Sequence, residues 1–268
     1  EVDEEQISKV LSSWREKVLQ RVGGFDNVVD ALLSNLGCVL ARSTSAVRGV
    51  FLHGPPGSGK SHLASALSAA AAGVEDADAP EPVEISSAVA STAGSTCELR
   101  EALAVATSRA RSASKHSQVV TLVVEGAEAL ISASDEEGTG MRLDSRLVVF
   151  ELILSTVRRW HEEALPAVML VPWASGAPVP SELAAAGVFE HRVTLPTPLG
   201  RGQRHAVLRV CTQSLPLGSD REEILDLEAD ATAGFLPCDL SALSRSAALA
   251  AVRRCATSRA CGDDSSLQ

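Results

Sequence analysis

Tyrosine is absent from the sequence, and aromatic residues make up only 3% of its 268 residues. Long apolar runs are absent as well, because none reaches the roughly 18 residues that a membrane-spanning helix needs. With 45% hydrophobic residues, the chain can still bury a large core, which must consist mainly of leucine, valine, isoleucine and alanine. These absences argue against direct membrane insertion and favour a soluble, helix-rich α/β protein.

Paired metal ligands are missing too. No two cysteines form a CxxC pair, and no two histidines stand four residues apart. Zinc sites depend on such spacings, so we expect no zinc site, reduced cytosolic thiols, and histidines that serve mostly as surface or packing residues. The six cysteines are Cys38, Cys97, Cys211, Cys238, Cys255 and Cys261.

Positive charge is scarce, since 24 lysines and arginines stand against 34 acids and the net charge is -10. Sequence-independent binding to nucleic acid rests mostly on neutralised phosphates, so we expect no nucleic-acid partner. The chain begins at Glu1 without methionine and without a basic-then-apolar leader. We therefore expect a cytoplasmic piece of a longer polypeptide rather than a secreted protein.

Hydrophobic periodicity divides the chain into four parts. Residues 1–21 predict one amphipathic helix, either a linker or a packing arm. Residues 22–199 alternate strands with helices, which is typical of a parallel α/β sheet. Residues 200–260 predict a small helical lid, and residues 261–268 a frayed tail. Strands are expected at 47–53, 83–86, 119–124, 167–171 and 192–195, and helices at 27–41, 60–72, 97–113, 143–163, 201–214, 220–232 and 238–258.

A glycine-rich loop follows the first expected strand and precedes a helix. Its sequence, GPPGSGKS, fits the phosphate-binding pattern GxxxxGK[ST] at every fixed position. In such a loop, backbone N–H groups turn toward the phosphates, the lysine reaches the terminal phosphates and the serine hydroxyl can ligate magnesium. We therefore predict a site for ATP and magnesium. Its residues are Gly57, Ser58, Gly59, Lys60, Ser61 and, through its backbone N–H, His62.

The strand expected at 119–124 is followed by an acid, Glu125. In P-loop enzymes an acid at this place holds magnesium, and a neighbouring glutamate usually activates the attacking water. Here Gly126 follows instead, and glycine cannot take a proton. Glu128 is an alternative base, but it lies three residues further on and equally suits a solvated surface carboxylate. We therefore predict Glu125 as a magnesium ligand and name no catalytic residue.

The order of these motifs resembles the AAA family over nearly the whole chain. In that family Gly23 and Gly24 would begin the module near the adenine, and residues 201–254 would form the lid. The resemblance implies that ATP binds between the α/β wedge and the lid. Lid positions that contact adenine and ribose in the family fall on Cys211, Pro237 and Cys238, which suit ordinary helix packing equally well.

Family members carry a polar sensor after the fourth strand and two arginine fingers that stabilise transferred charge. Counting back from the FEHR string at 189–192, which resembles the family's FDRE, the sensor falls on Ala174 and the fingers on Ala185 and Val188. None of these side chains can donate a hydrogen bond. The pore loop expected at 88–96 also lacks an aromatic residue, so gripping a threaded polypeptide is not expected.

Strings in the lid resemble the first, catalytically degenerate ATPase module of the peroxisomal biogenesis factor six family. They include Gly202-Gln203-Arg204, residues 214–218 and Ala233-Gly234-Phe235. This resemblance implies a heterohexameric protein-unfolding motor that exports peroxisomal import receptors. Its partners would be a neighbour subunit like peroxisomal biogenesis factor one and a peroxisomal membrane anchor protein. The acidic insert at 74–82 and the short loop at 134–140 depart from that family.

The sequence thus favours a degenerate AAA+ module that binds ATP and magnesium to support assembly, in the cytoplasm and at the peroxisome through its partners. One alternative is an active AAA ATPase of the segregase or ribosome-maturation type, using Glu125 or Glu128. Another is an adaptor that has lost nucleotide binding, against which Lys60 and Ser61 argue.

Overall fold

The structure is a computed structural model. It describes residues 4–43, 45–72, 83–84, 93–113, 118–127, 141–176, 179, 188–189 and 191–263. The chain divides into two compact units. The first comprises residues 1–21 and 25–196, and the second comprises residues 22–24 and 197–268.

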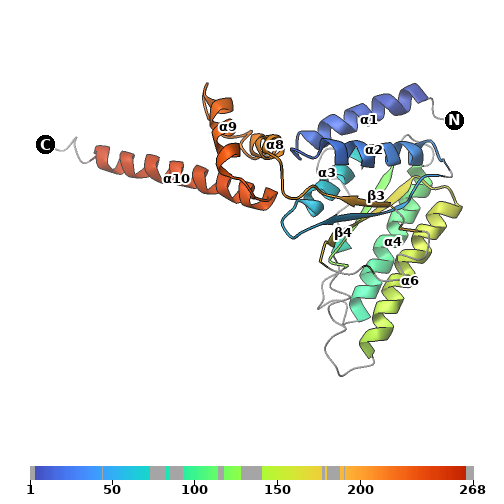
Figure 1. Cartoon of the computed structure of the whole chain (residues 1–268). Coiled ribbons are helices and arrows are strands. Elements are labelled where there is room, and N and C mark those ends of the chain that lie inside the picture. The colour runs from blue at the N-terminus through green and yellow to red at the C-terminus, as the bar shows by residue number, and fades with distance from the viewer. Residues whose placement is uncertain are drawn as a thin grey trace. The chain divides into compact units, whose positions relative to one another are not determined.

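The described residues of the first unit form a five-stranded sheet with the order β2-β3-β4-β1-β5 (Figure 1). All its strand pairs are parallel. The central strands β1 and β4 are buried along almost their whole length, as expected for a parallel sheet covered on both faces. The predicted α/β class is therefore confirmed. The strands are β1 (Gly49–Gly54), β2 (Val83–Glu84), β3 (Val120–Glu125), β4 (Ala167–Ala174) and β5 (His191–Thr194).

Helices cover both faces of this sheet (Figure 1). On one face, α2 and α3 pack against the strands, and α1 packs against both of these helices. On the other face, α4 and α6 pack against each other and against β4. The crossover helices thus bury the two apolar faces that a parallel sheet presents. Their bounds are α1 (Glu4–Leu19), α2 (Asp26–Leu40), α3 (Lys60–Ala72), α4 (Ala93–Ala113) and α6 (Met141–Glu162).

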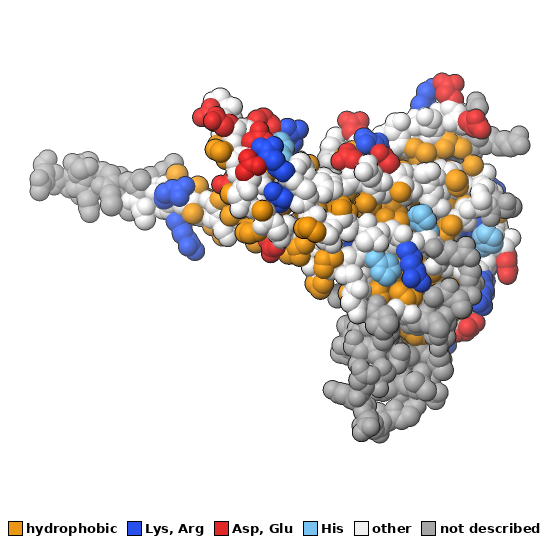
Figure 2. Space-filling model, in the orientation of Figure 1, with side chains coloured by type: hydrophobic (Ala, Val, Ile, Leu, Met, Phe, Trp, Pro, Cys, Tyr) orange, Lys and Arg blue, Asp and Glu red, His pale blue; other side chains and the backbone are white. Residues whose placement is uncertain are grey.

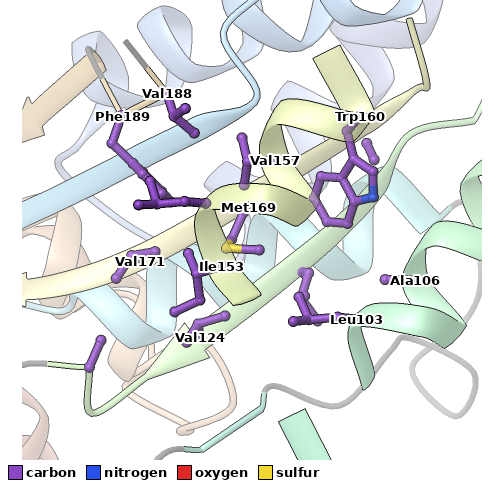
Figure 3. Packing of buried hydrophobic residues seen from close by; sticks show 14 of the residues in the cluster. Leu103, Ala106, Val124, Ile153, Val157, Trp160, Met169, Val171, Val188 and Phe189 are labelled. Atoms are coloured by element: carbon purple, nitrogen blue, oxygen red, sulfur yellow. The ribbon is translucent and has the colours of Figure 1, made fainter. Parts of the chain in front are cut away.

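A hydrophobic core fills the space between the sheet and the pair α4 and α6 (Figure 3). Side chains of Ile153 and Val157 from α6 lie around Met169 from β4. The buried Trp160 donates a hydrogen bond from Nε1 to Thr107 Oγ1 at 2.9 Å. This bond satisfies an indole N–H that would otherwise be costly to bury.

The first helix packs on the other helices of the first unit. On α1, Trp14 is 5% exposed and Val18 is fully buried. A Cβ atom on Gly37 of α2 would lie 2.9 Å from Leu11 Cδ1. The glycine therefore lets α1 approach α2 closely, and a linker role of α1 toward an upstream domain stays a prediction.

Strand β4 runs three residues beyond its predicted end, to Ala174, although it contains Pro172. The amide of Met169 donates to the Arg48 carbonyl in the direction of β1. Because N–H directions alternate along a strand, the nitrogen of Pro172 faces β3 instead. The pairing of β4 with β3 ends at Leu170, so the missing N–H of the proline costs no sheet hydrogen bond.

The second unit contains α8 (Arg201–Cys211), α9 (Arg221–Ala231) and α10 (Pro237–Asp263). Acidic and basic side chains lie close together over α8 and α9 (Figure 2), and Arg209 pairs with Glu222. The buried Arg204 donates to the carbonyls of Leu199 and Ala229, which ties α8 to the last turn of α9. Helix α10 also includes residues 261–263, which the sequence assigned to a frayed tail. No glycine or proline lies between Cys238 and Gly262 that would end the helix earlier.

Within the described residues, no helix is long and apolar enough to cross a membrane.

Candidate nucleotide-binding site

The glycine-rich loop connects the end of β1 to the start of α3. Gly57 and Gly59 have φ angles of 79° and 93°, a backbone region that favours glycine. A Cβ atom on Gly54 would lie 2.6 Å from Ser58 Oγ. The backbone at Gly57 and Gly59 therefore favours glycine, as expected for a loop that turns its N–H groups toward a phosphate, and a Cβ atom at Gly54 would displace the Ser58 side chain.

Lys60 is the first residue of α3 and is only 9% exposed. Its Nζ donates hydrogen bonds to the carbonyl oxygens of Gly54 at 2.8 Å and Pro55 at 2.9 Å. The ammonium group is thus held over the loop by the main chain of the loop itself. This places a positive charge where phosphate oxygens would bind.

The first turn of α3 presents backbone donors beside this charge. The amide of Leu63 donates to the Gly59 carbonyl at 2.9 Å, so the amides of Lys60, Ser61 and His62 precede the first hydrogen bond within the helix. The side chains of Ser61 and His62 are exposed. The positive end of the helix dipole adds to the attraction for anions.

The magnesium acid predicted from the sequence, Glu125, is the last residue of β3 and is half-buried. It lies in register with Glu84 of β2. Gly126 follows with a φ angle of 71°, and the next residue, Ala127, enters the hydrophobic core. Glu128, the alternative base, lies outside the described residues.

The positions expected for the sensor and the fingers differ in their surroundings. Ala174 ends β4 and lies in register with Gly54 of β1. Val188 packs in the hydrophobic core and is 9% exposed. Ala185 lies outside the described residues, as do residues 88–92 and the side chains of 93–96 in the expected pore loop. The insert at 74–82 and the loop at 134–140 also lie outside them.

His53 borders the loop, although sequence reasoning treated it as a surface or packing residue. Its ring meets the ring of Phe51 edge-on, with centroids 5.8 Å apart. Its Nε2 atom is buried and has no hydrogen-bond partner in the described part of the chain. Burial, and then the positive charges of Arg192 and Lys60, hold the pKa of His53 below its usual value. The ring is therefore neutral at neutral pH. In the sequence, only the position of His53 next to Gly54 indicated that its side chain would border the loop.

Gly23 and Gly24, predicted near the adenine, pack within the second unit. A Cβ atom on Gly23 would lie 2.1 Å from the carbonyl oxygen of Ala206. Gly24 has a φ angle of 80°, and its carbonyl accepts a hydrogen bond from Gln203 Nε2 at 3.0 Å. The glycine pair is thus required by close packing on α8. The sequence analysis named Gln203 as part of a lid string but did not predict its contact with Gly24.

The remaining predicted lid residues also lie in the second unit. Burial raises the pKa of the Cys211 thiol, which disfavours its thiolate form. Cys238 is exposed, and partial burial followed by the neighbouring Asp239 raises the pKa of its thiol. Pro237 begins α10, where a proline costs no helical hydrogen bond. Contacts of these three residues with a nucleotide stay a prediction.

Comparison with known proteins finds distant similarity to an ATPase. No protein-family model matches the chain. Over 247 residues, it is 26% identical to the ribosome biogenesis ATPase RIX7 of Saccharomyces cerevisiae. The match covers 88% of this chain but only 27% of that relative's length. This similarity supports a general ATPase relationship and does not single out the peroxisomal branch.

Two features of the chain agree with this relationship. Its sheet is parallel with helices on both faces, and its phosphate loop stands between β1 and α3. Together with the similarity to an ATPase, they support an AAA+ fold for this chain.

Proposed function

We propose that this module binds ATP with magnesium and holds it, with little or no hydrolysis of its own. The observation that carries the proposal is the contrast between two neighbouring strand ends. After β1, the loop has its glycine geometry and Lys60 in place. After β3, the residue next to Glu125 is Gly126, in a backbone conformation suited to glycine.

The residues present fit the triphosphate and the metal. The backbone of Gly57 to His62 would hold the phosphates, and Lys60 would contact the terminal ones. Ser61 and Glu125 would hold magnesium, which supplies positive charge to balance the phosphates. The positive φ angles of Gly57 and Gly59 support this fit, since they belong to a backbone that turns its N–H groups toward a phosphate.

Hydrolysis lacks its usual groups. A general base must stand within hydrogen-bond reach of the attacking water, and Gly126 has no side chain. Ala174 has no donor beside Gly54, and Val188 is a core residue. The sensor and finger positions therefore offer no side-chain donor that would stabilise transition-state charge, either at this site or at the site of a neighbouring subunit.

Retained nucleotide would act on assembly. A ligand that binds only the assembled form stabilises it by RT ln(1 + [L]/Kd), which is about 2.7 kcal/mol at a hundredfold excess over Kd. We propose a heterohexameric motor with a neighbour like peroxisomal biogenesis factor one and a peroxisomal membrane anchor as its setting. This finer assignment rests on the lid strings that include Gly202 to Arg204.

Binding and turnover measured together test the proposal. We expect calorimetry to detect MgATP binding by the chain, and phosphate release to stay at background with and without the candidate neighbour. Lys60→Ala should abolish binding. Lys17→Ala, which changes an exposed lysine on α1, should leave binding unchanged. Turnover at rates typical of active ATPases that Lys60→Ala abolishes would refute the proposal.

A second candidate is an active ATPase in ribosome maturation, and the similarity to RIX7 favours it. It would need Glu125 or Glu128 as its base. Co-sedimentation separates the two candidates. Nucleotide-dependent binding to ribosomal precursor particles, together with turnover, would support the second, whereas nucleotide-dependent assembly with the peroxisomal neighbour would support the first.

A further inference from the structure

The ring of His62 makes a contact that phosphate binding does not require. Its Nε2 atom lies 3.1 Å from the carbonyl oxygen of Arg21. A carbonyl oxygen only accepts hydrogen bonds, so Nε2 carries the proton and donates it. The ring thus joins the first turn of α3 to a residue 41 positions earlier in the chain.

Arg21 stands at a turning point of the main chain. Helix α1 ends at Leu19, and the amides of Gln20 and Arg21 still donate to Glu16 and Val18 at 3.0 Å each. The Arg21 carbonyl lies beyond the last of these bonds, where helix ends leave acceptors without helical partners. The chain leaves the first unit immediately after Arg21. The His62 ring therefore anchors the last main-chain carbonyl before that departure.

The contact between His62 and Arg21 lies next to the expected phosphate site. Phosphates on the loop would lie against the amides that end at His62. The nucleoside part of the ligand continues from the phosphates. The imidazole ring of His62 joins the first turn of α3 to the main chain at Arg21. An anchored main chain beside the nucleoside would lower the ordering cost of binding.

We propose that His62 is a positioning residue for the nucleoside part of the ligand, acting through the Arg21 carbonyl. The inference rests on the proposed nucleotide binding. It assigns the backbone N–H of His62 to the phosphates and its ring to the main chain at Arg21, which would face the nucleoside. Loss of the ring should therefore affect a nucleoside triphosphate and spare a bare polyphosphate.

Calorimetry with two ligands, MgATP and magnesium tripolyphosphate, tests this division. His62→Leu removes the donor, and we expect it to weaken ATP binding about tenfold, the effect of one lost hydrogen bond. Tripolyphosphate binding should stay within about twofold. His62→Gln, whose amide nitrogen can replace Nε2, should restore ATP binding to within about threefold. Ser65→Leu, an apolar change at an exposed position one turn later on α3, is the matched control.

Each contrary outcome has a distinct meaning. Equal weakening of both ligands in His62→Leu, or unchanged ATP binding, would overturn the inference while leaving the proposed function intact. A Ser65→Leu variant as weak as His62→Leu would also overturn it. If the unaltered chain bound neither ligand, the proposed function itself would fall. Should the leucine variant not fold, His62→Asn, whose side chain is too short to reach Arg21, takes its place.

Discussion

Ala174, the last residue of β4, lies opposite Gly54, the last residue of β1. The carbonyl oxygen of Gly54 accepts two hydrogen bonds, from Lys60 Nζ at 2.8 Å and from the amide of Ser175 at 3.1 Å. The end of β4 is thus held directly against the phosphate loop. A polar side chain at position 174 would border that loop, whereas the methyl group of alanine offers it no donor.

The conformation of Gly126 leads to the first prediction. A φ angle of 71° costs a residue with a Cβ atom about 1–2 kcal/mol. We expect Gly126→Ala and Gly126→Glu each to lower the melting temperature by about 2–8 °C. Because of the same strain, Gly126→Glu should not restore phosphate release. Thermal unfolding and a phosphate-release assay measure the two effects.

A matched control for this prediction is Gly176→Ala. A Cβ atom there meets nothing within 4 Å, and its backbone is ordinary, so stability should change by less than about 0.5 kcal/mol. A Gly126→Glu variant that is as stable as the unaltered chain and hydrolyses ATP briskly would show that the missing carboxylate is the only defect after β3.

Two glycines of the second unit should respond to alanine in opposite directions. At Gly23 a new Cβ would lie 2.1 Å from a main-chain oxygen of α8, and we expect Gly23→Ala to destabilise the chain by about 1–3 kcal/mol. At Gly202 nothing lies within 4 Å, so Gly202→Ala should stabilise α8 by about 0.5–1 kcal/mol. Thermal unfolding of the full chain compares them. Shifts of the same sign would contradict the packing described for Gly23.

Local patterns predicted much of the fold. The apolar run before GPPGSGKS and the alanine-rich run after it became β1 and α3, because their spacing and their flanking glycines are local signals. The parallel sheet followed from strands that alternate with helices. Strand β4 was predicted too short, since a proline usually ends a strand and the limit of its pairing with β3 is a tertiary feature.

Long-range contacts of the site were beyond prediction. The glycine after Glu125 was visible in the sequence, but its left-handed backbone was not. The contact of His62 with Arg21 joins the first turn of α3 to a turn residue just after α1, and periodicity treats these segments separately. Gly23 and Gly24 were read as the start of the wedge, yet they pack with α8 of the second unit. Such contacts depend on which surfaces meet, and a local pattern contains no information on that.

The low pKa of His53 predicts a loss of stability in acid. The unfolded chain binds a proton at this residue below pH about 6.5, whereas burial and the charges of Arg192 and Lys60 keep the folded residue neutral to lower pH. Above pH 6.5 the residue is neutral in both states and contributes no pH dependence. Below it, the unfolded state takes up a proton that the folded state refuses, so the free energy of unfolding falls as the pH falls.

Substitution isolates this contribution from the other histidines. We expect His53→Gln to unfold with a shallower pH dependence than the unaltered chain below pH 6.5, with the two slopes differing by at most about 1.4 kcal/mol per pH unit. Urea unfolding at a series of pH values between about 5 and 8 measures both slopes. Parallel curves across that range would mean that the folded His53 takes up its proton as readily as the unfolded one. Burial beside Lys60 and Arg192 would then not keep the ring neutral, and the acid sensitivity of the chain would have to come from other groups.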